Sequence, residues 1–102
     1  MSFSVGGENR INTYEIPGAY IKRPTNGEEE PAGRWGAISF DDGGRRTLAV
    51  VNDSKYSYDC PDNDLRLTVI RNVIFADHYS DRPAANFNFT DEGMQRFEYG
   101  IF

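Results

Sequence analysis

Residues 52–59 hold the side chains of this chain that are best suited to bind a ligand. The segment reads Asn-Asp-Ser-Lys-Tyr-Ser-Tyr-Asp. Asn52 and Asp53 could exchange hydrogen bonds with sugar hydroxyls, and Lys55 could pair with a carboxylate. Tyr56 or Tyr58 could stack on a pyranose ring. The same residue types also build rigid corners, because Asn and Asp bond their own backbone and packed tyrosines find hydroxyl partners nearby. Both interpretations stay open.

Metal chemistry has little support in the sequence. A catalytic zinc site takes three protein ligands from His, Asp, Glu or Cys. The chain has one histidine, His78, and one cysteine, Cys60, so we expect it to hold no metal or other cofactor. Residues 59–64 offer clustered oxygen ligands that could suit calcium, but they lack the glycine and distal glutamate of an EF-hand loop. A solvated turn is the preferred interpretation there.

Two further features admit a functional and a structural interpretation. Glu28, Glu29 and Glu30 could act as acid and base, but adjacent like charges in a loop between Pro24 and Pro31 normally face water. Trp35 could serve as a platform for a sugar ring. Because its segment also holds apolar residues at positions 38 and 40, a core position is the preferred interpretation.

Composition narrows the class of protein. The chain has 102 residues and a net charge of −5, which indicates a single domain and argues against a nucleic-acid partner. Its apolar runs are too short to cross a membrane, and the N-terminus lacks the basic and apolar regions of a signal peptide. With one cysteine there is no internal disulfide, so we expect a reducing, cytoplasmic location.

The elements that must position these side chains are strands. Residues 34–40 and 46–51 read as a hairpin around the Asp-Asp-Gly-Gly turn at 41–44. The continuous apolar run at 48–51 predicts burial on both faces. Further strands are expected at 11–16, 19–22, 55–59, 65–71 and 95–102. The segment 72–94 is expected to be loop, with single helical turns opening at 83–85 and 91–93. The predicted fold is an all-β antiparallel sandwich spanning residues 1–102, as a single domain or as a fragment of a larger one.

The last predicted strand carries apolar residues at 97, 99 and 101 on one face and runs to the end of the sequence. A strand in this place indicates truncation or pairing across an interface. We therefore expect a homodimer or a higher homo-oligomer that covers the open edges.

Residues 16–102 resemble the C-terminal β domain of the family 38 glycoside hydrolases, the α-mannosidases. Five groups of residues carry the likeness in order. They are Tyr-Glu-Ile-Pro-Gly at 14–18 with Ile-Lys-Arg-Pro at 21–24, Gly-Glu-Glu at 27–29 with Pro-Ala-Gly-Arg-Trp at 31–35, Val-Asn-Asp-Ser-Lys-Tyr-Ser-Tyr-Asp at 51–59, Leu-Arg-Leu-Thr-Val-Ile-Arg at 65–71, and Phe-Glu-Tyr-Gly-Ile at 97–101. Ser57 stands where the family usually has glycine.

The resemblance implies a role within a larger enzyme. Members are retaining α-mannosidases whose catalytic zinc and aspartate nucleophile lie in an N-terminal domain, so the likeness gives this chain no catalytic residue. It implies a non-catalytic part that supports hydrolysis of terminal α-mannose. Its partner would be the catalytic domain of the parent enzyme, and it would meet carbohydrate indirectly. In that setting Asn52, Asp53, Lys55, Tyr56 and Tyr58 are candidates for the rim of the substrate cleft.

Two alternatives compete with this interpretation. A stand-alone carbohydrate-binding module would need an exposed aromatic platform, built from Trp35, Tyr56 or Tyr58. An unrelated interaction domain would use the acidic loop at 24–31 to meet a basic partner, and its binding would weaken steeply with salt.

Overall fold

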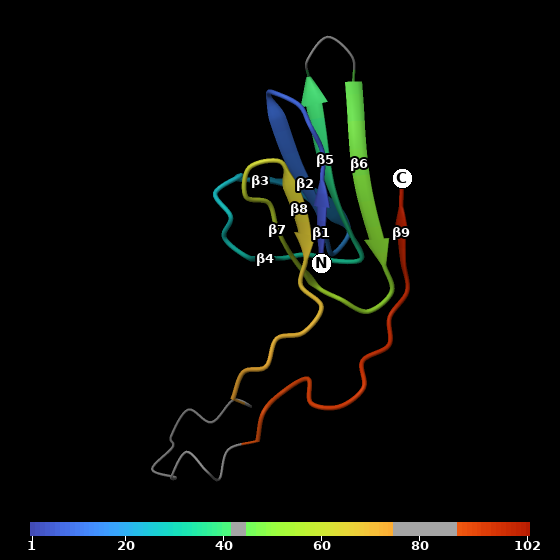
Figure 1. Ribbon diagram of the computed structural model, residues 1–102. Helices are drawn as coiled ribbons and strands as arrows, with labels where there is room; N and C mark the ends of the chain where they lie inside the picture. The colour runs from blue at the N-terminus through green and yellow to red at the C-terminus, as the bar shows by residue number, and fades with distance from the viewer. Residues whose placement is uncertain (42–44, 75–87) are drawn as a thin grey trace.

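The computed structural model describes residues 1–41, 45–74 and 88–102, and the side chain of Arg45 lies outside this description. Within these residues the chain forms strands and no helix (Figure 1). The strands are β1 (Ser2–Ser4), β2 (Arg10–Ile16), β3 (Ala19–Arg23), β4 (Glu30–Pro31), β5 (Trp35–Asp41), β6 (Arg45–Asn52), β7 (Ser57–Asp59), β8 (Asp64–Leu67) and β9 (Tyr99–Ile101).

The strands form two antiparallel sheets that pack face to face. One sheet has the order β1-β8-β7-β4, and the other has the order β3-β2-β5-β6-β9. The predicted all-β sandwich is therefore confirmed. The β5–β6 hairpin is the longest pairing, running from Trp35 opposite Val51 to Asp41 opposite Arg45. The turn predicted between these strands lies mostly outside the described residues.

The core lies between the sheets and follows from period-2 alternation. Tyr14, Ile38, Phe40 and Val50 point inward from the five-stranded sheet. Tyr58, Cys60, Leu65 and Leu67 meet them from β7, β8 and the residue after β7. Burying an apolar side chain of this size stabilises a fold by roughly 1.5–3 kcal/mol. Gly36 on β5 leaves room for this packing, since a Cβ there would lie 3.0 Å from Cδ1 of Tyr58.

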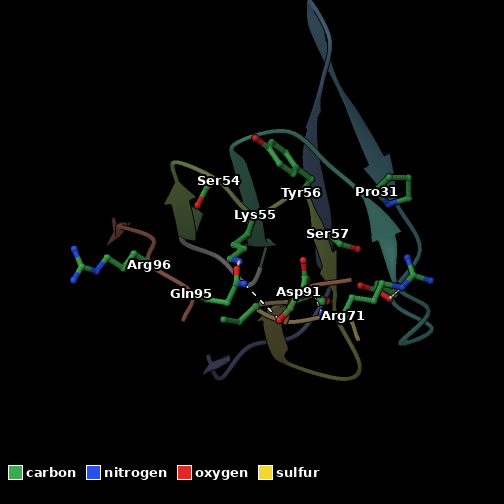
Figure 2. Close-up of a pocket in the computed structure, with 12 residues that line it drawn as sticks. Pro31, Ser54, Lys55, Tyr56, Ser57, Arg71, Asp91, Gln95 and Arg96 are labelled. Atoms are coloured by element: carbon green, nitrogen blue, oxygen red, sulfur yellow. Dashed lines mark hydrogen bonds and ion pairs between the residues drawn. The ribbon is translucent and has the colours of Figure 1, made fainter. Parts of the chain in front are cut away.

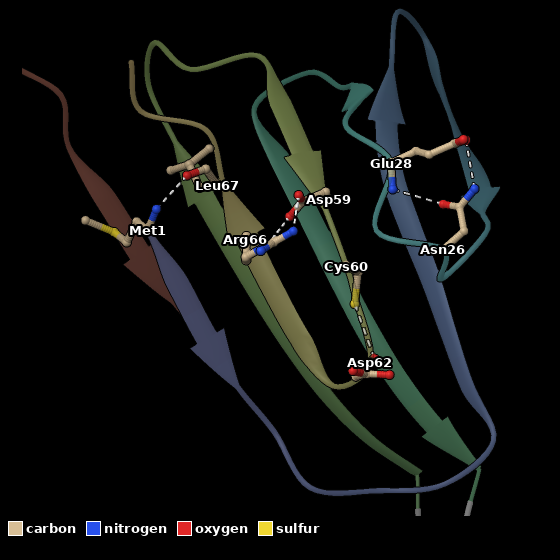
Figure 3. Close-up of polar contacts among 8 residues, drawn as sticks. All are labelled: Met1, Asn26, Glu28, Asp59, Cys60, Asp62, Arg66 and Leu67. Atoms are coloured by element: carbon tan, nitrogen blue, oxygen red, sulfur yellow. Dashed lines mark hydrogen bonds and ion pairs between the residues drawn. The ribbon is translucent and has the colours of Figure 1, made fainter. Parts of the chain in front are cut away.

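Polar contacts fix the register of the smaller sheet. The amino group of Met1 donates to the carbonyl of Leu67 at 2.9 Å, which fastens the start of the chain to β8. Arg66 on β8 faces its register partner Asp59 on β7 and makes two hydrogen bonds to its carboxylate, at 2.6 and 2.5 Å (Figure 3). A bidentate guanidinium–carboxylate pair adds directional specificity to the pairing of two short strands.

Some sequence-based predictions of the elements are wrong. The run at 48–51 is not buried on both faces. Val50 is inaccessible, but Val51 is 39% exposed, because it points to the outer face of its sheet, which none of the strands in 1–41, 45–74 and 88–102 covers. The strand predicted for 65–71 ends at Leu67, and the one predicted for 95–102 is limited to Tyr99–Ile101.

The loops also differ from expectation. Asp91 and Gly93 have positive φ angles of 57° and 95°, which rule out the right-handed helical turn predicted at 91–93. The turn predicted at 83–85 lies outside the described residues. The acidic loop at 24–31 is not fully detached, since Asn26 bridges to Pro61 and β4 pairs with β7. Strand β1 was missed because three residues are too few to show an alternation.

Candidate functional site

Asn52 is the centre of the corner between β6 and β7. Its side chain is only 4% exposed and uses both of its polar atoms. The Oδ1 atom accepts hydrogen bonds from the backbone amides of Ser54 at 3.0 Å and Lys55 at 2.5 Å. The Nδ2 atom donates to the Tyr58 hydroxyl at 2.7 Å and to the Arg34 carbonyl at 3.3 Å. One side chain therefore holds the turn against Arg34, just before β5, and against β7.

Tyr58 completes this arrangement from inside the core. Its ring is fully buried and lies 5.6 Å from the ring of Tyr14. Its hydroxyl accepts the Asn52 hydrogen bond and donates to the Val50 carbonyl at 3.3 Å. Burial raises the pKa of the Tyr58 hydroxyl, and the hydrogen bond from Asn52 partly opposes that shift. Asn52 and Tyr58 thus have the geometry of residues that position the corner.

The other three predicted site residues lie at the surface of the same corner. Asp53 is exposed and accepts hydrogen bonds from the Glu98 amide at 3.0 Å and the Ser54 hydroxyl at 2.8 Å. These bonds, with the Glu98 amide first, lower the pKa of the Asp53 carboxyl. Lys55 donates to Oε1 of Gln95 at 3.0 Å, and its amine lies 5.5 Å from the centre of the Phe97 ring. Tyr56 is 64% exposed.

Lys55 and Tyr56 line a cleft of about 540 Å³ that four separate segments enclose. We call it the Tyr56 cleft. Its lining residues are Glu29, Pro31, Ser54, Lys55, Tyr56, Ser57, Thr68, Val69, Arg71, Asp91, Gln95 and Arg96. Figure 2 shows Tyr56 at one end of the cleft, Arg71 and Asp91 at the other, and Ser57 between them, while Arg96 points outward. The volume lies within the range of about 300–1,000 Å³ that is usual for small-molecule sites.

Acidic and basic groups are interspersed in the cleft. The Arg71 guanidinium lies 3.9 Å from the Glu29 carboxylate, a long and exposed ion pair. Hydrogen bonds from Thr68 and Ser57, and then the charge of Arg71, lower the pKa of the Glu29 carboxyl despite the opposing effect of its partial burial. Glu29 is therefore an ionised acceptor at neutral pH. Arg71 and the hydroxyl groups supply donors within the same cleft.

Two arms of the chain, 68–74 and 88–96, form one wall of the Tyr56 cleft. The first arm leaves β8 and the second leads into β9, and both lie at the end of the sandwich where β6 finishes (Figure 1). Thr90 joins them, because its hydroxyl donates to the Arg71 carbonyl at 2.7 Å and its amide donates to the Val73 carbonyl at 2.9 Å. The Asp91 carboxylate accepts the Arg71 amide at 2.9 Å. These bonds set the position of Arg71 in the wall.

A second, more apolar cleft of about 440 Å³ adjoins the first and shares Pro31 and Tyr56 with it. Ile16, Pro17 and Ala32 are among its lining residues. Tyr56 therefore stands between a polar cleft and an apolar one, with its ring accessible to solvent. The carbonyl of Tyr56 accepts the Ala32 amide at 2.9 Å, which fixes the backbone beneath the ring.

The remaining candidates from the sequence are placed elsewhere. Trp35 is half-buried on β5 and is absent from the lining of the two clefts that Tyr56 adjoins. Within the acidic loop, Glu30 pairs with Arg23 at 3.4 Å, and the Glu28 carboxylate accepts a hydrogen bond from the side-chain amide of Asn26 at 2.8 Å. His78 lies outside the described residues.

Of the residues considered for calcium, three are bonded to other protein groups, and the side chain of the fourth, Asp62, is exposed. Asp59 binds Arg66, Asn63 accepts from Arg10 at 2.9 Å, and Asp64 accepts from the Ser4 hydroxyl. Among the described residues no group of three or more His, Cys, Asp or Glu side chains could hold a metal ion.

Cys60 is buried, and burial raises the pKa of its thiol. No helix of the described residues is long and apolar enough to cross a membrane.

The fold and the cleft define a β-sandwich domain whose candidate site residues lie at one corner of the sandwich. Comparison with known families makes this specific. The model of the glycosyl hydrolases family 38 C-terminal domain matches residues 1–79, and the chain belongs to this family. It is a non-catalytic domain of family 38 enzymes, as the resemblance of its motifs implied. No curated protein and no solved structure matches the chain.

Sequence reasoning missed most of the Tyr56 cleft. Glu29 was interpreted as a solvated charge, Arg71 as the end of a strand, and Asp91 as the start of a helical turn. Arg71 had no clear signal, because the strand predicted to reach it ends at Leu67. Asp91 had none, since its place depends on backbone bonds between the two arms.

Proposed function

We propose that this domain is the non-catalytic β-sandwich part of a family 38 α-mannosidase and supports hydrolysis of terminal α-mannose there. The single observation that carries the proposal is the family match over residues 1–79. The match gives the family and its C-terminal domain, and the proposal adds the mannose specificity and the supporting role to that assignment. The retaining chemistry, with its zinc and its aspartate nucleophile, would belong to the catalytic domain of the parent enzyme, which would be the partner of this chain.

The corner at 52–59 would contribute through its two halves. The Asn52 side chain donates to the Tyr58 hydroxyl at 2.7 Å and accepts a hydrogen bond from the Lys55 amide at 2.5 Å. These two bonds hold the corner in place. Asp53, Lys55 and Tyr56 are then presented at the surface. At the rim of the substrate cleft, Lys55 and Tyr56 would contact the sugar next to the one that is cleaved, and Asn52 and Tyr58 would act through them.

The exposed edge at β9 supports a further part of the proposal, and the single cysteine supports another. Ile101 and Phe102 are 51% and 77% exposed where β9 ends its sheet. Exposed apolar strand edges favour pairing with another chain, so we propose a homo-oligomer in which they are covered. We also propose a cytoplasmic location, on the ground that the buried Cys60 is the one cysteine of the chain.

The test compares hydrolysis of an aryl α-mannoside, with added zinc, by this chain and by the full reading frame that encodes it. We expect cleavage by the full-length protein alone. A full-length protein that cleaves an aryl β-mannoside or an α-glucoside instead would overturn the mannose assignment. Cleavage by the 102-residue chain itself would overturn the non-catalytic role.

A further inference from the structure

We infer that the Tyr56 cleft is a binding site for a neutral saccharide, and that the chain binds it without turnover. The inference deepens the proposed function, since it names the ligand class that Tyr56 and Lys55 would meet. It does not depend on mannosidase activity, because binding is measured on this chain alone.

The first argument is the accessible ring of Tyr56. Of the three aromatic residues that could form a sugar platform, Tyr58 is fully buried and Trp35 is half-buried, whereas Tyr56 is 64% exposed. Its backbone is fixed by the Ala32 amide, and the preceding amide of Lys55 is fixed by Asn52. A rigid aromatic residue beside a cleft loses little conformational entropy when a ring stacks on it.

The second argument is the pattern of donors and acceptors below that ring. The Glu29 carboxylate, the Ser57 and Thr68 hydroxyls and the Arg71 guanidinium lie in one cleft. A sugar diol both donates and accepts hydrogen bonds, so it needs acceptors such as Glu29 and donors such as Arg71 side by side. The 3.9 Å separation of the Glu29 and Arg71 groups leaves both with capacity for a further hydrogen bond.

The third argument concerns charge. The lining holds two acidic residues, Glu29 and Asp91, and three basic ones, Lys55, Arg71 and Arg96. The signs are mixed, Lys55 bonds Gln95, and Arg96 points out of the cleft (Figure 2). A phosphate site would gather positively charged side chains around the ligand. The mixed lining fits an uncharged polyol better than an anion.

The experiment is a titration of the 102-residue chain with α-linked mannotriose, followed by amide chemical shifts. We expect millimolar binding with the largest shifts at residues 54–57, 68–71 and 91–96. Changing the salt from about 50 to 500 mM should alter the affinity less than about twofold, because the ligand is neutral. Inorganic phosphate should not compete.

Two variants with a matched control test the residues. Tyr56→Ala should weaken binding roughly 3- to 10-fold, and Glu29→Gln should also weaken it, with both variants folded as judged by unchanged shifts in the core. Tyr20→Ala is the control, because Tyr20 is equally exposed, at 68%, but lies on β3 outside the Tyr56 cleft. It should bind like the unaltered chain.

The possible outcomes separate this inference from the proposed function. Absence of shifts with mannotriose, tighter binding of phosphate, or equal losses in Tyr56→Ala and Tyr20→Ala would each overturn the saccharide site. If the full-length protein nevertheless cleaves the aryl α-mannoside, the proposed function stands without it. If the chain binds mannotriose while the full-length protein is inactive on mannosides, the site stands and the mannosidase assignment fails.

Discussion

The corner at 52–59 and the Tyr56 cleft beside it share a segment of chain but have opposite physical character. In the corner, every polar atom of the Asn52 side chain is bonded inside the protein, and Tyr58 is buried behind it. In the cleft, Glu29 and Arg71 are separated by 3.9 Å and Tyr56 is 64% exposed. Bonds already made within a protein stabilise it, and groups left accessible can serve a ligand. The difference predicts where substitutions cost stability and where they cost binding.

The sharpest test of this comparison uses two tyrosines that are two residues apart. Tyr58→Ala removes a fully buried ring from between the sheets and should lower the free energy of unfolding by about 3–5 kcal/mol. Tyr56→Ala removes an exposed ring and should change it by less than about 0.5 kcal/mol. Urea or thermal unfolding of both variants measures the difference. Similar losses would show that Tyr56 belongs to the core.

A smaller effect is expected at Asn52. Asn52→Ala leaves the amides of Ser54 and Lys55 and the Tyr58 hydroxyl without this partner, which should cost about 1–3 kcal/mol. Ser54→Ala is the matched control, because it keeps the backbone bond to Asn52. It should stay within about 0.5 kcal/mol of the unaltered chain in the same unfolding measurement. A stable Asn52→Ala variant would mean that water replaces the side chain, and the corner would then not be rigid by itself.

The sequence predicted the corner far better than the cleft, for a physical reason. The β5–β6 hairpin and the alternation of Leu65 and Leu67 are local patterns of side chains that face one core. The residue types of the corner also indicated that Asn52 could bond its own backbone. The cleft brings Glu29, Arg71 and Asp91 together from positions far apart in sequence. Their proximity depends on long-range pairings, such as Thr90 with Val73, that no local pattern specifies.

The buried hydroxyls of Tyr58 and Tyr14 refine the comparison further. The Tyr58 hydroxyl has two partners, whereas the Tyr14 hydroxyl is buried and has no hydrogen-bond partner among the described residues. Tyr58→Phe should therefore lower the free energy of unfolding by about 1 kcal/mol, and Tyr14→Phe should leave it unchanged or raise it slightly. The two substitutions remove the same atom from neighbouring rings. Chemical denaturation at neutral pH measures both, and an equal loss would reveal a partner for Tyr14.

The smallest expected effect is the pH dependence that Glu29 adds to stability. Bonds from Thr68 and Ser57, together with Arg71, lower the pKa of its carboxyl below the ordinary value of 4.5. The unfolded chain then binds the proton more readily than the folded one, so the stabilisation is present above about pH 4.5 and is lost as the pH falls through the folded pKa. Glu29→Gln should remove this acid-dependent loss, measured as the midpoint of urea unfolding between about pH 6 and pH 3.

Thr68→Val separates the cause of that shift from the charge itself. It keeps the carboxylate and the Arg71 ion pair but removes the hydroxyl that contributes most to the lowered pKa of Glu29. Its acid-dependent loss should fall between those of the unaltered chain and Glu29→Gln. If Thr68→Val matches the unaltered chain, the Thr68 hydroxyl does not hold Glu29. The lowered pKa of Glu29 would then come from Ser57 and Arg71, and the Thr68 hydroxyl would be accessible to a ligand in the cleft.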